Sequence, residues 1–392
     1  MNQSVESLRI TFWGTQGSLQ YFPDPTQVGE YADLIATDCL RRVFAMAEEK
    51  FGDKSFTIQD LLGGELDQAS LAKLYQTIGR AAPAVYGGET TCAEIETSDG
   101  FVFVIDGGSG IRHFAKKRVL DWKDRDDREL TIFGTHDHLD HRIGLPFSSM
   151  CFAQPAFRLQ VYGNYRFLAA LDDRFAVFSQ EVTEATHRDD PLDYRMMSAE
   201  FTGTQILCHD SPLETDQRVP NCSTHDAVTP IVIGETVITP FPTYHGSTPC
   251  LAYRFEHKGK SFVFCTDHEL RHGAVADHPN QIRSEKTEES VRAHCQHVDV
   301  AYFDGQYLMD EYLGRVGTGN SQGVPRIDWG HSAIEDVVER ARVCEIGRTF
   351  VGHHDPDREW LDRMKLDEWC HEQSVRLGRH IELAKDRQVI NL

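Results

Sequence analysis

The chain has 392 residues, 40% of them apolar, enough for two average domains or one large α/β domain with a sizeable core. Its formal net charge is −21 and it contains no basic tract. A long nucleic acid is therefore not expected as a partner, because that binding depends on neutralising phosphates with Lys and Arg. A small anionic substrate is compatible with this charge, since a local metal centre can hold one.

The ten cysteines are scattered and include no CxxC pair, a pattern typical of reduced thiols rather than of a disulfide framework. No apolar run has the length of a membrane helix, and the first residues lack the basic and then apolar start of a secretory signal. The sequence therefore predicts a cytoplasmic protein that has no contact with a membrane.

Short apolar runs separated by Gly and Pro predict strands along most of the chain. Residues 251–267 predict a hairpin that turns at Gly259. Ser332 and Glu335 have the S-x-x-E spacing of a capping box, so a helix should begin at about Ala333. A long C-terminal helix is expected after Pro356. The remaining expected strands are residues 8–14, 101–106, 129–135, 157–163, 298–305 and 348–352.

Two segments interrupt this pattern. Residues 19–84 predict a pair of helices, the second of them capped by Asp67. We expect this segment to be a helical subdomain attached to the core, with a lid or a homodimer contact as alternatives. Residues 171–229 are polar and rich in Asp, Thr and Pro, which predicts loops with one or two short helices. Residues 1–392 are then expected to form a single domain that carries both insertions.

A cluster of potential metal ligands follows the strand expected at 129–135, in the sequence THDHLDH: His136, His138, Asp140 and His141. His136 and His138 alternate along an extended segment and so lie on the same side of it. Asp140 and His141 follow where the chain turns. Two ligand pairs on one loop suit two divalent cations, and the mixture of imidazole and carboxylate favours zinc, with manganese or iron as alternatives.

The THDHLDH segment resembles the signature of the metallo-β-lactamase superfamily, an α/β fold built as a four-layer αββα sandwich with its metals at the edge between two sheets. The most similar branch is that of ribonuclease Z and the phosphoribosyl cyclic phosphodiesterases. The chain resembles that branch in an FWGT.GS loop at 12–18, a GG.T.C turn at 87–92 and a D.G.G loop at 106–110. This resemblance covers most of the chain apart from the two insertions.

The resemblance implies three further ligands later in the chain. His245 would join the first ligand pair of the cluster, and Asp267 would bridge both metals. His353 would complete the second metal, with the adjacent His354 as the alternative. The implied set of metal ligands is His136, His138, Asp140, His141, His245, Asp267 and His353.

The resemblance also implies catalytic roles for Asp140 and for two residues outside the ligand set. His331, in WGHSAIED, matches a histidine of ribonuclease Z-like enzymes, and Asp304, in YFDGQY, lies where that branch keeps an acidic residue. Such a pair could protonate a leaving alkoxide, because the imidazolium donates the proton while the carboxylate orients it. The alternative for His331 is a structural role near a helix N-terminus.

Together these residues predict a dinuclear metal-dependent hydrolase, a phosphodiesterase. Two cations would lower the pKa of a shared water so that hydroxide forms and attacks phosphorus, while His331 protonates the departing oxygen. The short interval between His245 and Asp267 is filled by the expected hairpin. It leaves no room for the arm with which short ribonuclease Z clamps tRNA. The expected substrate is therefore a small cyclic phosphodiester, a cyclic nucleotide or a ribose cyclic phosphate.

Other interpretations stay open at this point. The same metal site could hydrolyse thioesters or lactones, process RNA as ribonuclease Z does, or serve a non-catalytic ligand sensor. A separate group of residues is a candidate for a structural metal site, although its spacing matches no strong zinc-finger pattern. Its members are Cys208, His209, Cys222 and His225.

Overall fold

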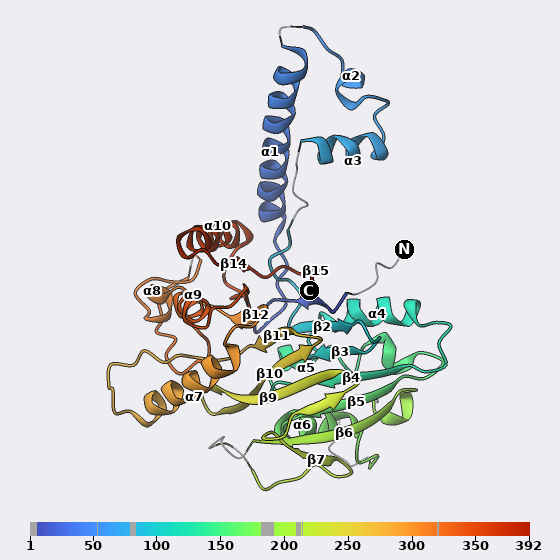
Figure 1. Ribbon diagram of the computed structural model, residues 1–392, viewed down its shortest axis with the longest axis vertical. Helices are drawn as coiled ribbons and strands as arrows, with labels where there is room; N and C mark the ends of the chain where they lie inside the picture. The colour runs from blue at the N-terminus through green and yellow to red at the C-terminus, as the bar shows by residue number, and fades with distance from the viewer. Residues whose placement is uncertain are drawn as a thin grey trace. The chain divides into compact units, whose positions relative to one another are not determined.

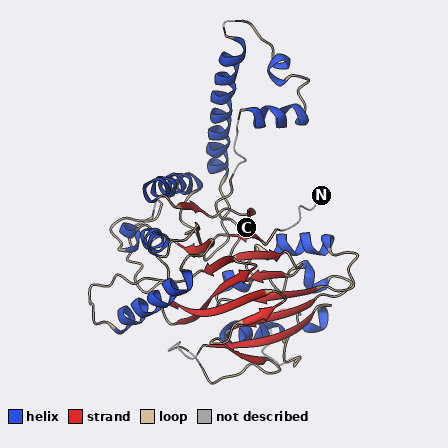
Figure 2. Cartoon of the chain, viewed as in Figure 1, coloured by secondary structure: helices blue, strands red, loops and turns tan. Residues whose placement is uncertain are grey.

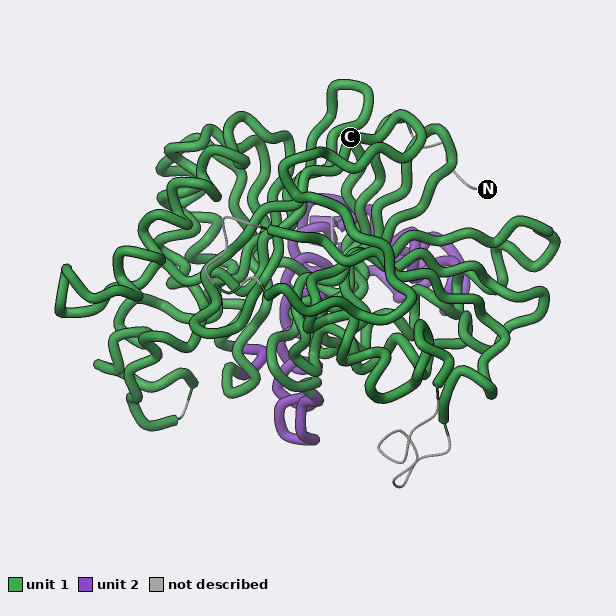
Figure 3. Tube along the Cα trace, turned by 90° about the horizontal axis from the view of Figure 1, so that it is seen from below, with its two compact units in different colours: residues 1–21, 86–358, 362–392 green, residues 22–85, 359–361 purple. Residues whose placement is uncertain are grey.

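The computed structural model describes residues 6–52, 54–78, 84–181, 192–208, 213, 215–319 and 321–392. The chain divides into two compact units, shown in different colours in Figure 3. Unit 1 comprises residues 1–21, 86–358 and 362–392, and unit 2 comprises residues 22–85 and 359–361. Unit 2 nearly coincides with the segment 19–84 that the sequence marks as a helical insertion.

Eight of the described strands form the first sheet of unit 1. In chain order they are β1 (Leu8–Gly14), β2 (Cys92–Thr97), β3 (Val102–Ile105), β4 (Glu129–Phe133), β5 (Arg158–Gly163), β6 (Glu200–Leu207), β7 (Ser223–Asp226) and β15 (Gln388–Asn391). Their order in the sheet is β15-β1-β2-β3-β4-β5-β6-β7 (Figure 1). From β3 to β7 all neighbours are parallel, whereas β15, β1, β2 and β3 pair antiparallel.

Seven of the described strands form the second sheet. They are β8 (Ile231–Ile233), β9 (Thr236–His245), β10 (Thr248–His257), β11 (Lys260–Cys265), β12 (Val300–Asp304), β13 (Arg348–Gly352) and β14 (His380–Leu383). Their order is β14-β13-β12-β11-β10-β9-β8. The hairpin expected at 251–267 is β10 and β11, which pair antiparallel, and β11 to β14 are parallel.

Helices cover the outer faces of the two sheets (Figure 2). On β4, Leu130 and Ile132 pack into the apolar core beneath the helices of the first sheet. Phe133 points the opposite way and packs on Tyr253 of the second sheet, with ring centroids 5.1 Å apart. The result is the expected four-layer αββα sandwich. Its helices include α4 (Ile111–Asp121) and α6 (Tyr165–Phe175) on the first sheet and α7 (Pro279–Cys295) and α9 (Ile334–Val343) on the second.

Unit 2 contains α1 (Pro25–Phe51), α2 (Ile58–Leu62) and α3 (Gln68–Thr77). The structure therefore has helices at both positions that the sequence predicts, with the short α2 between them. Asp67 caps α3 as expected, since its carboxylate accepts a hydrogen bond from Ser70 N at 2.7 Å. Among the described residues no helix combines the length and the apolar character that crossing a membrane requires.

Residues 171–229 differ from the expected loop-rich insertion, because they contribute β6 and β7 to the first sheet. The sequence of β7, STHD, has no buried residue, since this strand lies at the edge of the sheet. Short polar edge strands carry little of the apolar alternation by which strands are recognised. The local composition of residues 171–229 therefore does not predict that they add strands to the first sheet.

The predicted capping box before α9 is also absent. The N-cap of this helix is Ala333, which provides no side-chain hydrogen bond. The hydroxyl of Ser332 donates instead to the carbonyl of His268, and Glu335 accepts from Met309 N at 2.9 Å. The side chains of Ser332 and Glu335 therefore bond to residues elsewhere in the chain and do not cap α9.

A buried ion pair joins α7 to α9 behind the second sheet. The guanidinium of Arg340 donates to Glu288 at 2.6 Å, and His268 Nε2 lies 2.8 Å from the same carboxylate. Burial would raise the pKa of Glu288, but the charge of Arg340 and the hydrogen bond from His268 outweigh burial and lower it. The ionised form of Glu288 is therefore stabilised in the folded protein.

Glu288→Gln is expected to reduce the free energy of unfolding by about 3–5 kcal/mol at pH 7, because it leaves Arg340 buried and unpaired. Because the pKa of Glu288 is lowered on folding, its ionised carboxylate stabilises the folded protein at pH values above its ordinary pKa of 4.5. This stabilisation is lost as the pH falls below that value. The difference between the two proteins should therefore shrink below that value in urea unfolding curves. The exposed pair of Glu339 and Arg342 offers a control, since Glu339→Gln should change little. A constant difference across this pH range would contradict the account.

Candidate metal centre

The site residues predicted from the sequence meet at one edge of unit 1, where strands of both sheets end. The carboxyl ends of neighbouring parallel strands lie at the same sheet edge, so side chains that follow them converge. From the first sheet come Asp106 after β3 and the segment 136–141 after β4. From the second sheet come His245 at the end of β9, Asp267 after β11, Asp304 at the end of β12 and His353 after β13.

Three of these residues follow their strands and lie in the left-handed backbone region. The φ angles are 60° at Asp106, 53° at Asp267 and 55° at His353. For residues other than glycine this conformation costs on the order of 1–3 kcal/mol each and persists only where the surroundings enforce it. The sharp turn after each strand directs the side chain to the sheet edge instead of along the strand.

The first group of potential ligand atoms consists of His136, His138, His245 and Asp267, all within 4.8 Å of one another. His245 Nε2 lies 3.5 Å and His136 Nε2 lies 3.8 Å from Asp267 Oδ1. His138 Nδ1 lies 3.2 Å from His245 Nε2. Three imidazoles and one carboxylate oxygen thus surround a single point.

The second group consists of Asp140, His141 and His353, whose ligand atoms also lie within 4.8 Å of one another. His141 Nε2 and His353 Nε2 are each 3.2 Å from Asp140 Oδ2. The same nitrogens lie 3.3 Å and 3.5 Å from Asp267 Oδ2. Asp267 therefore turns one oxygen toward each group, which is the arrangement of a bridging carboxylate.

Three ring nitrogens of the clustered histidines have no hydrogen-bond partner among the described residues. They are His136 Nε2, His141 Nε2 and His353 Nδ1, and all three are buried. Buried polar atoms in folded proteins are nearly always paired, so such atoms call for an ion or a water. Nitrogen donors from histidine with carboxylate oxygens form a ligand set for divalent transition metals. The residues present fit two such cations.

The pKa shifts of the clustered histidines are consistent with a site for two cations. Burial lowers the pKa of His136 well below the ordinary histidine range and that of His245 to about 4, so both are neutral, as metal ligation requires. Burial would also lower the pKa of His141, but the surrounding carboxylates, Asp140 first, raise it well above the ordinary range. The centre thus concentrates negative charge that two cations would neutralise.

Hydrogen bonds behind the ligands orient their rings. His245 Nδ1 donates to the carbonyl of Gly330 at 2.9 Å, and His141 Nδ1 lies 2.7 Å from Asp106 Oδ2. Such bonds leave Nε2 as the atom that faces the metal position. Asp106 is itself held by the backbone N–H and hydroxyl of Thr135 at 2.8 Å and 2.9 Å. Gly330 has a φ of 90°, and a Cβ there would collide with the ring of His245.

Asp106→Asn is expected to weaken metal binding by about 10- to 100-fold, because the side chain that orients His141 can no longer accept its N–H with a carboxylate. Competition against a chromogenic chelator measures the change. Asp121→Asn removes only a surface pair with Lys117 and serves as the control. Equal affinities for the Asp106 and Asp121 variants would show that Asp106 has no part in holding the metal.

The structure brings His353, and not His354, into the centre. His354 Nε2 donates to the carbonyl of Ala384 at 2.8 Å. Burial and the nearby charge of Arg363 lower its pKa to about 3. His354 is thus a satisfied buried histidine on the opposite side of the strand end, whereas His353 faces the two carboxylates.

His331 and Asp304 form the expected pair beside the centre. His331 Nδ1 lies 3.2 Å from Asp304 Oδ2 and 3.7 Å from Asp267 Oδ1. Asp304 also accepts hydrogen bonds from the backbone N–H groups of His268 and Ser332, both at 3.2 Å. Burial would lower the pKa of His331, but the hydrogen bond to Asp304 and the nearby carboxylates raise it. The geometry favours a protonated imidazole next to the potential metal positions.

Two residues that support the metal centre, Asp106 and Glu269, are not predicted from the sequence. Asp106 was noted only as part of a D.G.G loop, although a carboxylate after a strand that neighbours the ligand strand is a usable signal. Glu269 is the other: its carboxylate accepts from Asp328 N at 2.9 Å and from Gly330 N at 2.7 Å, and also from the hydroxyl of Tyr312. It thereby holds the loop that precedes His331. No local signal identifies that role, because its partners lie far along the chain.

The second candidate metal site is not supported by the described residues. The groups of clustered metal-ligating side chains among them include none of Cys208, Cys222 and His225, and His209 lies outside the described residues. His225 Nε2 donates to the carbonyl of Thr229 at 2.7 Å, in an ordinary turn contact.

Comparison with known proteins shows the family to which the chain belongs. A family model described as "Beta-lactamase superfamily domain" matches residues 102–354, more than half of the chain. No curated protein matches the chain. The chain belongs to this superfamily. Its αββα fold and its paired His/Asp groups support a metal-dependent hydrolase of the metallo-β-lactamase type.

Solved structures match along the whole chain at low identity. The metallo-beta-lactamase fold protein YhfI from Bacillus subtilis is 14% identical, with 99% of this chain and 100% of that chain covered and a TM-score of 0.50. A diphosphatase from the PhnP family is 14% identical, with 98% of both chains covered and a TM-score of 0.49. Human tRNase Z, short form, is 13% identical, with 98% of both chains covered and a TM-score of 0.49.

Proposed function

We propose that the protein is a phosphodiesterase that hydrolyses a small cyclic phosphodiester, a cyclic nucleotide or a ribose cyclic phosphate, with two divalent metal ions. The observation that supports this most is the His331–Asp304 pair beside the bridging carboxylate of Asp267. Hydrolysis of a ribose phosphodiester expels an alkoxide, which needs a proton donor, whereas thioesters release a stable thiolate. We further propose zinc as the native metal, ahead of manganese and iron, because imidazole nitrogens dominate the ligand set.

Three side chains and the bound metal ions would have separate roles in the hydrolysis. Bound divalent cations supply an activated water and neutralise the negative charge of the phosphate. Asp267 keeps the two ligand groups at a constant separation, because it offers one oxygen to each. Asp304 accepts the Nδ1–H of His331 and keeps the ring charged and oriented. His331 then gives its Nε2 proton to the leaving oxygen as the P–O bond breaks.

The proposed substrate is small for two reasons. Residues 246–266 are all described, and β10 and β11 with their tight turn account for nearly all of them, so no protruding arm lies between His245 and Asp267. The net charge of −21 opposes a polyanion, whose binding requires many Lys and Arg contacts to phosphates. We also propose a cytoplasmic location, which the ten cysteine thiols support.

A substrate panel tests the proposal. Zinc- and manganese-loaded protein is assayed with cyclic nucleotides, ribose cyclic phosphates, thioesters and lactones, and its binding of tRNA is measured at physiological salt. We expect kcat/KM for one cyclic phosphodiester to exceed that for every thioester and lactone by roughly 10²-fold or more, as general acid catalysis allows. A parallel preparation of Asp267→Asn reports contaminating hydrolases. A best substrate among the thioesters or lactones, or tight tRNA binding, would overturn the proposal.

A further inference from the structure

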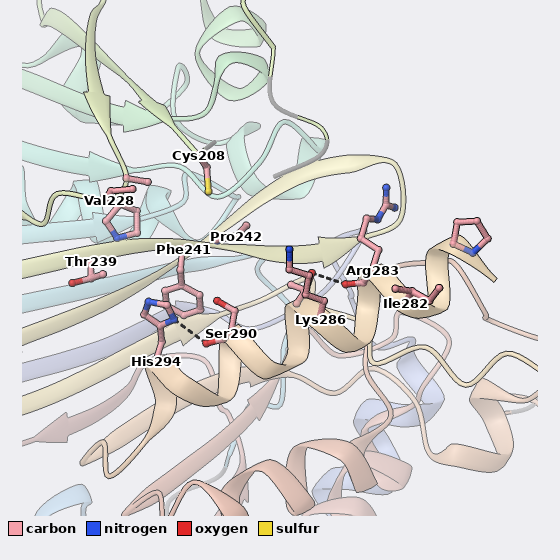
Figure 4. A pocket seen from close by; sticks show the side chains of 14 residues that line it. Cys208, Val228, Thr239, Phe241, Pro242, Ile282, Arg283, Lys286, Ser290 and His294 are labelled. Atoms are coloured by element: carbon pink, nitrogen blue, oxygen red, sulfur yellow. Dashed lines mark hydrogen bonds between the residues drawn. The ribbon is translucent and has the colours of Figure 1, made fainter. Parts of the chain in front are cut away.

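A cavity of about 730 Å³ lies between α7 and β9 (Figure 4). It is lined on one side by α7, on another by the middle of β9, and at its rim by Cys208, Ala227 and Val228, which follow β6 and β7. Cavities of about 300–1,000 Å³ are those that take small organic ligands. None of its lining residues belongs to the metal centre.

The cavity exists because the second sheet stops short at this edge. β8 pairs with β9 only from Thr236 to Ile238, so none of the described strands pairs with the next residues of β9 on that side. Two of those residues, Pro240 and Pro242, have no backbone N–H to offer. Another strand therefore cannot pair along this edge, which favours a small molecule over an extended peptide as the occupant.

One face of α7 presents polar and cationic side chains to the cavity. Arg283, Lys286, Ser290 and His294 recur at helical spacing, and Figure 4 shows them in a row along the helix. Within the part of the chain that the structure describes, neither Arg283 nor Lys286 forms an ion pair with a carboxylate. A cavity with this lining attracts an anion.

A second part of the lining is apolar and includes side chains from both β9 and α7. The rings of Phe241 and His294 stack with their centroids 4.2 Å apart and an interplanar angle of 5°. His294 Nδ1 donates to the carbonyl of Ser290 at 2.8 Å, which sets the orientation of this ring. Together with Val228 and Ile282 these rings provide a wall for an apolar body. The ligand chemistry that matches both walls is an organic anion with a ring.

We propose that this cavity is a binding site for a small aromatic anion, separate from the metal centre. Lys286 and Arg283 hold its acidic group, and the apolar wall around Phe241 holds its ring. Arg283 also donates to the carbonyl of Gly246, directly after His245, and its guanidinium lies 4.8 Å from the ring centroid of Tyr244. Because Arg283 supports the turn next to a metal ligand, the test leaves it unchanged.

The test uses 8-anilinonaphthalene-1-sulfonate as the probe, with metal-loaded full-length protein. Fluorescence titration and calorimetry should show one saturable site on the wild type. Lys286→Glu reverses the charge at an exposed helix position, and Ser290→Trp fills the cavity; each should weaken binding at least tenfold. Lys365→Glu changes the net charge equally on the surface of α10 (Trp360–Leu377) and should bind like the wild type.

Competition separates the role of charge from that of shape. 2-Naphthoate should displace the probe, whereas the neutral 2-naphthalenemethanol should displace it at least tenfold less well. Circular dichroism and metal content verify that each variant is folded. The absence of a saturable site on the wild type, equal binding to the Lys286 and Lys365 variants, or equal displacement by both naphthalenes would overturn the proposal. None of these results depends on the identity of the substrate at the metal centre.

Discussion

Replacing Asp267 with asparagine is expected to reduce the bound metal from two equivalents to one or fewer and to lower kcat by at least roughly 10²-fold. The loss of a supporting residue behind a ligand already costs about 10- to 100-fold, and Asp267 faces both groups directly. An asparagine has one oxygen where the carboxylate has two. Its NH₂ group, which cannot ligate a metal, would face one of the two ligand groups. The two ligand groups would then lack their common carboxylate.

Plasma mass spectrometry of the dialysed protein measures the metal, and hydrolysis of bis(p-nitrophenyl) phosphate measures the rate. Asp99→Asn is the matched control, since Asp99 lies near Glu235 and His257 in a separate group on unit 1. That group does not require a metal, because the ring nitrogens of His257 each lie 3.0 Å from a hydroxyl. Two full equivalents of metal in the Asp267 variant would show that the carboxylate does not bridge.

His331→Ala is expected to lower kcat by about 10²–10⁴-fold on a cyclic phosphodiester whose leaving group is an alkoxide, the usual contribution of a positioned general acid. The same variant should lose far less on bis(p-nitrophenyl) phosphate, because p-nitrophenolate is a stable anion that leaves without a proton. Metal content should stay at the wild-type value, since His331 Nδ1 lies nearer Asp304 than Asp267.

Asp304→Asn separates orientation from proton donation. It keeps the shape of the side chain but removes the carboxylate that His331 Nδ1 faces at 3.2 Å. We expect its loss of kcat to be smaller than that of His331→Ala and to show the same dependence on the leaving group. Equal losses of kcat on both substrates would mean that His331 supports the structure of the metal site and does not donate a proton to the leaving group. Full activity of the His331 variant would favour a thioester hydrolase, since a thiolate leaves without a proton donor.

Much of the fold was predictable because the strands that carry the site are buried on both faces. Such strands appear as near-continuous apolar runs, so β13, which precedes His353, has the expected bounds. The edge strand β7 was missed because its side chains contact solvent and leave no apolar pattern. Ser332 was mistaken for a helix cap because local spacing cannot show that its hydroxyl donates to His268, 64 residues away.

The sequence by itself identified the candidate ligands that lie close together along the chain. His136, His138, Asp140 and His141 share one loop, so their spacing alone indicated a metal site, and the resemblance to a known family extended it. Only the tertiary structure decided which of His353 and His354 enters the centre, and that Asp106 and Glu269 support it. The physical reason is that a histidine's role depends on what its two nitrogens contact, and those contacts join residues from separate strands of two sheets.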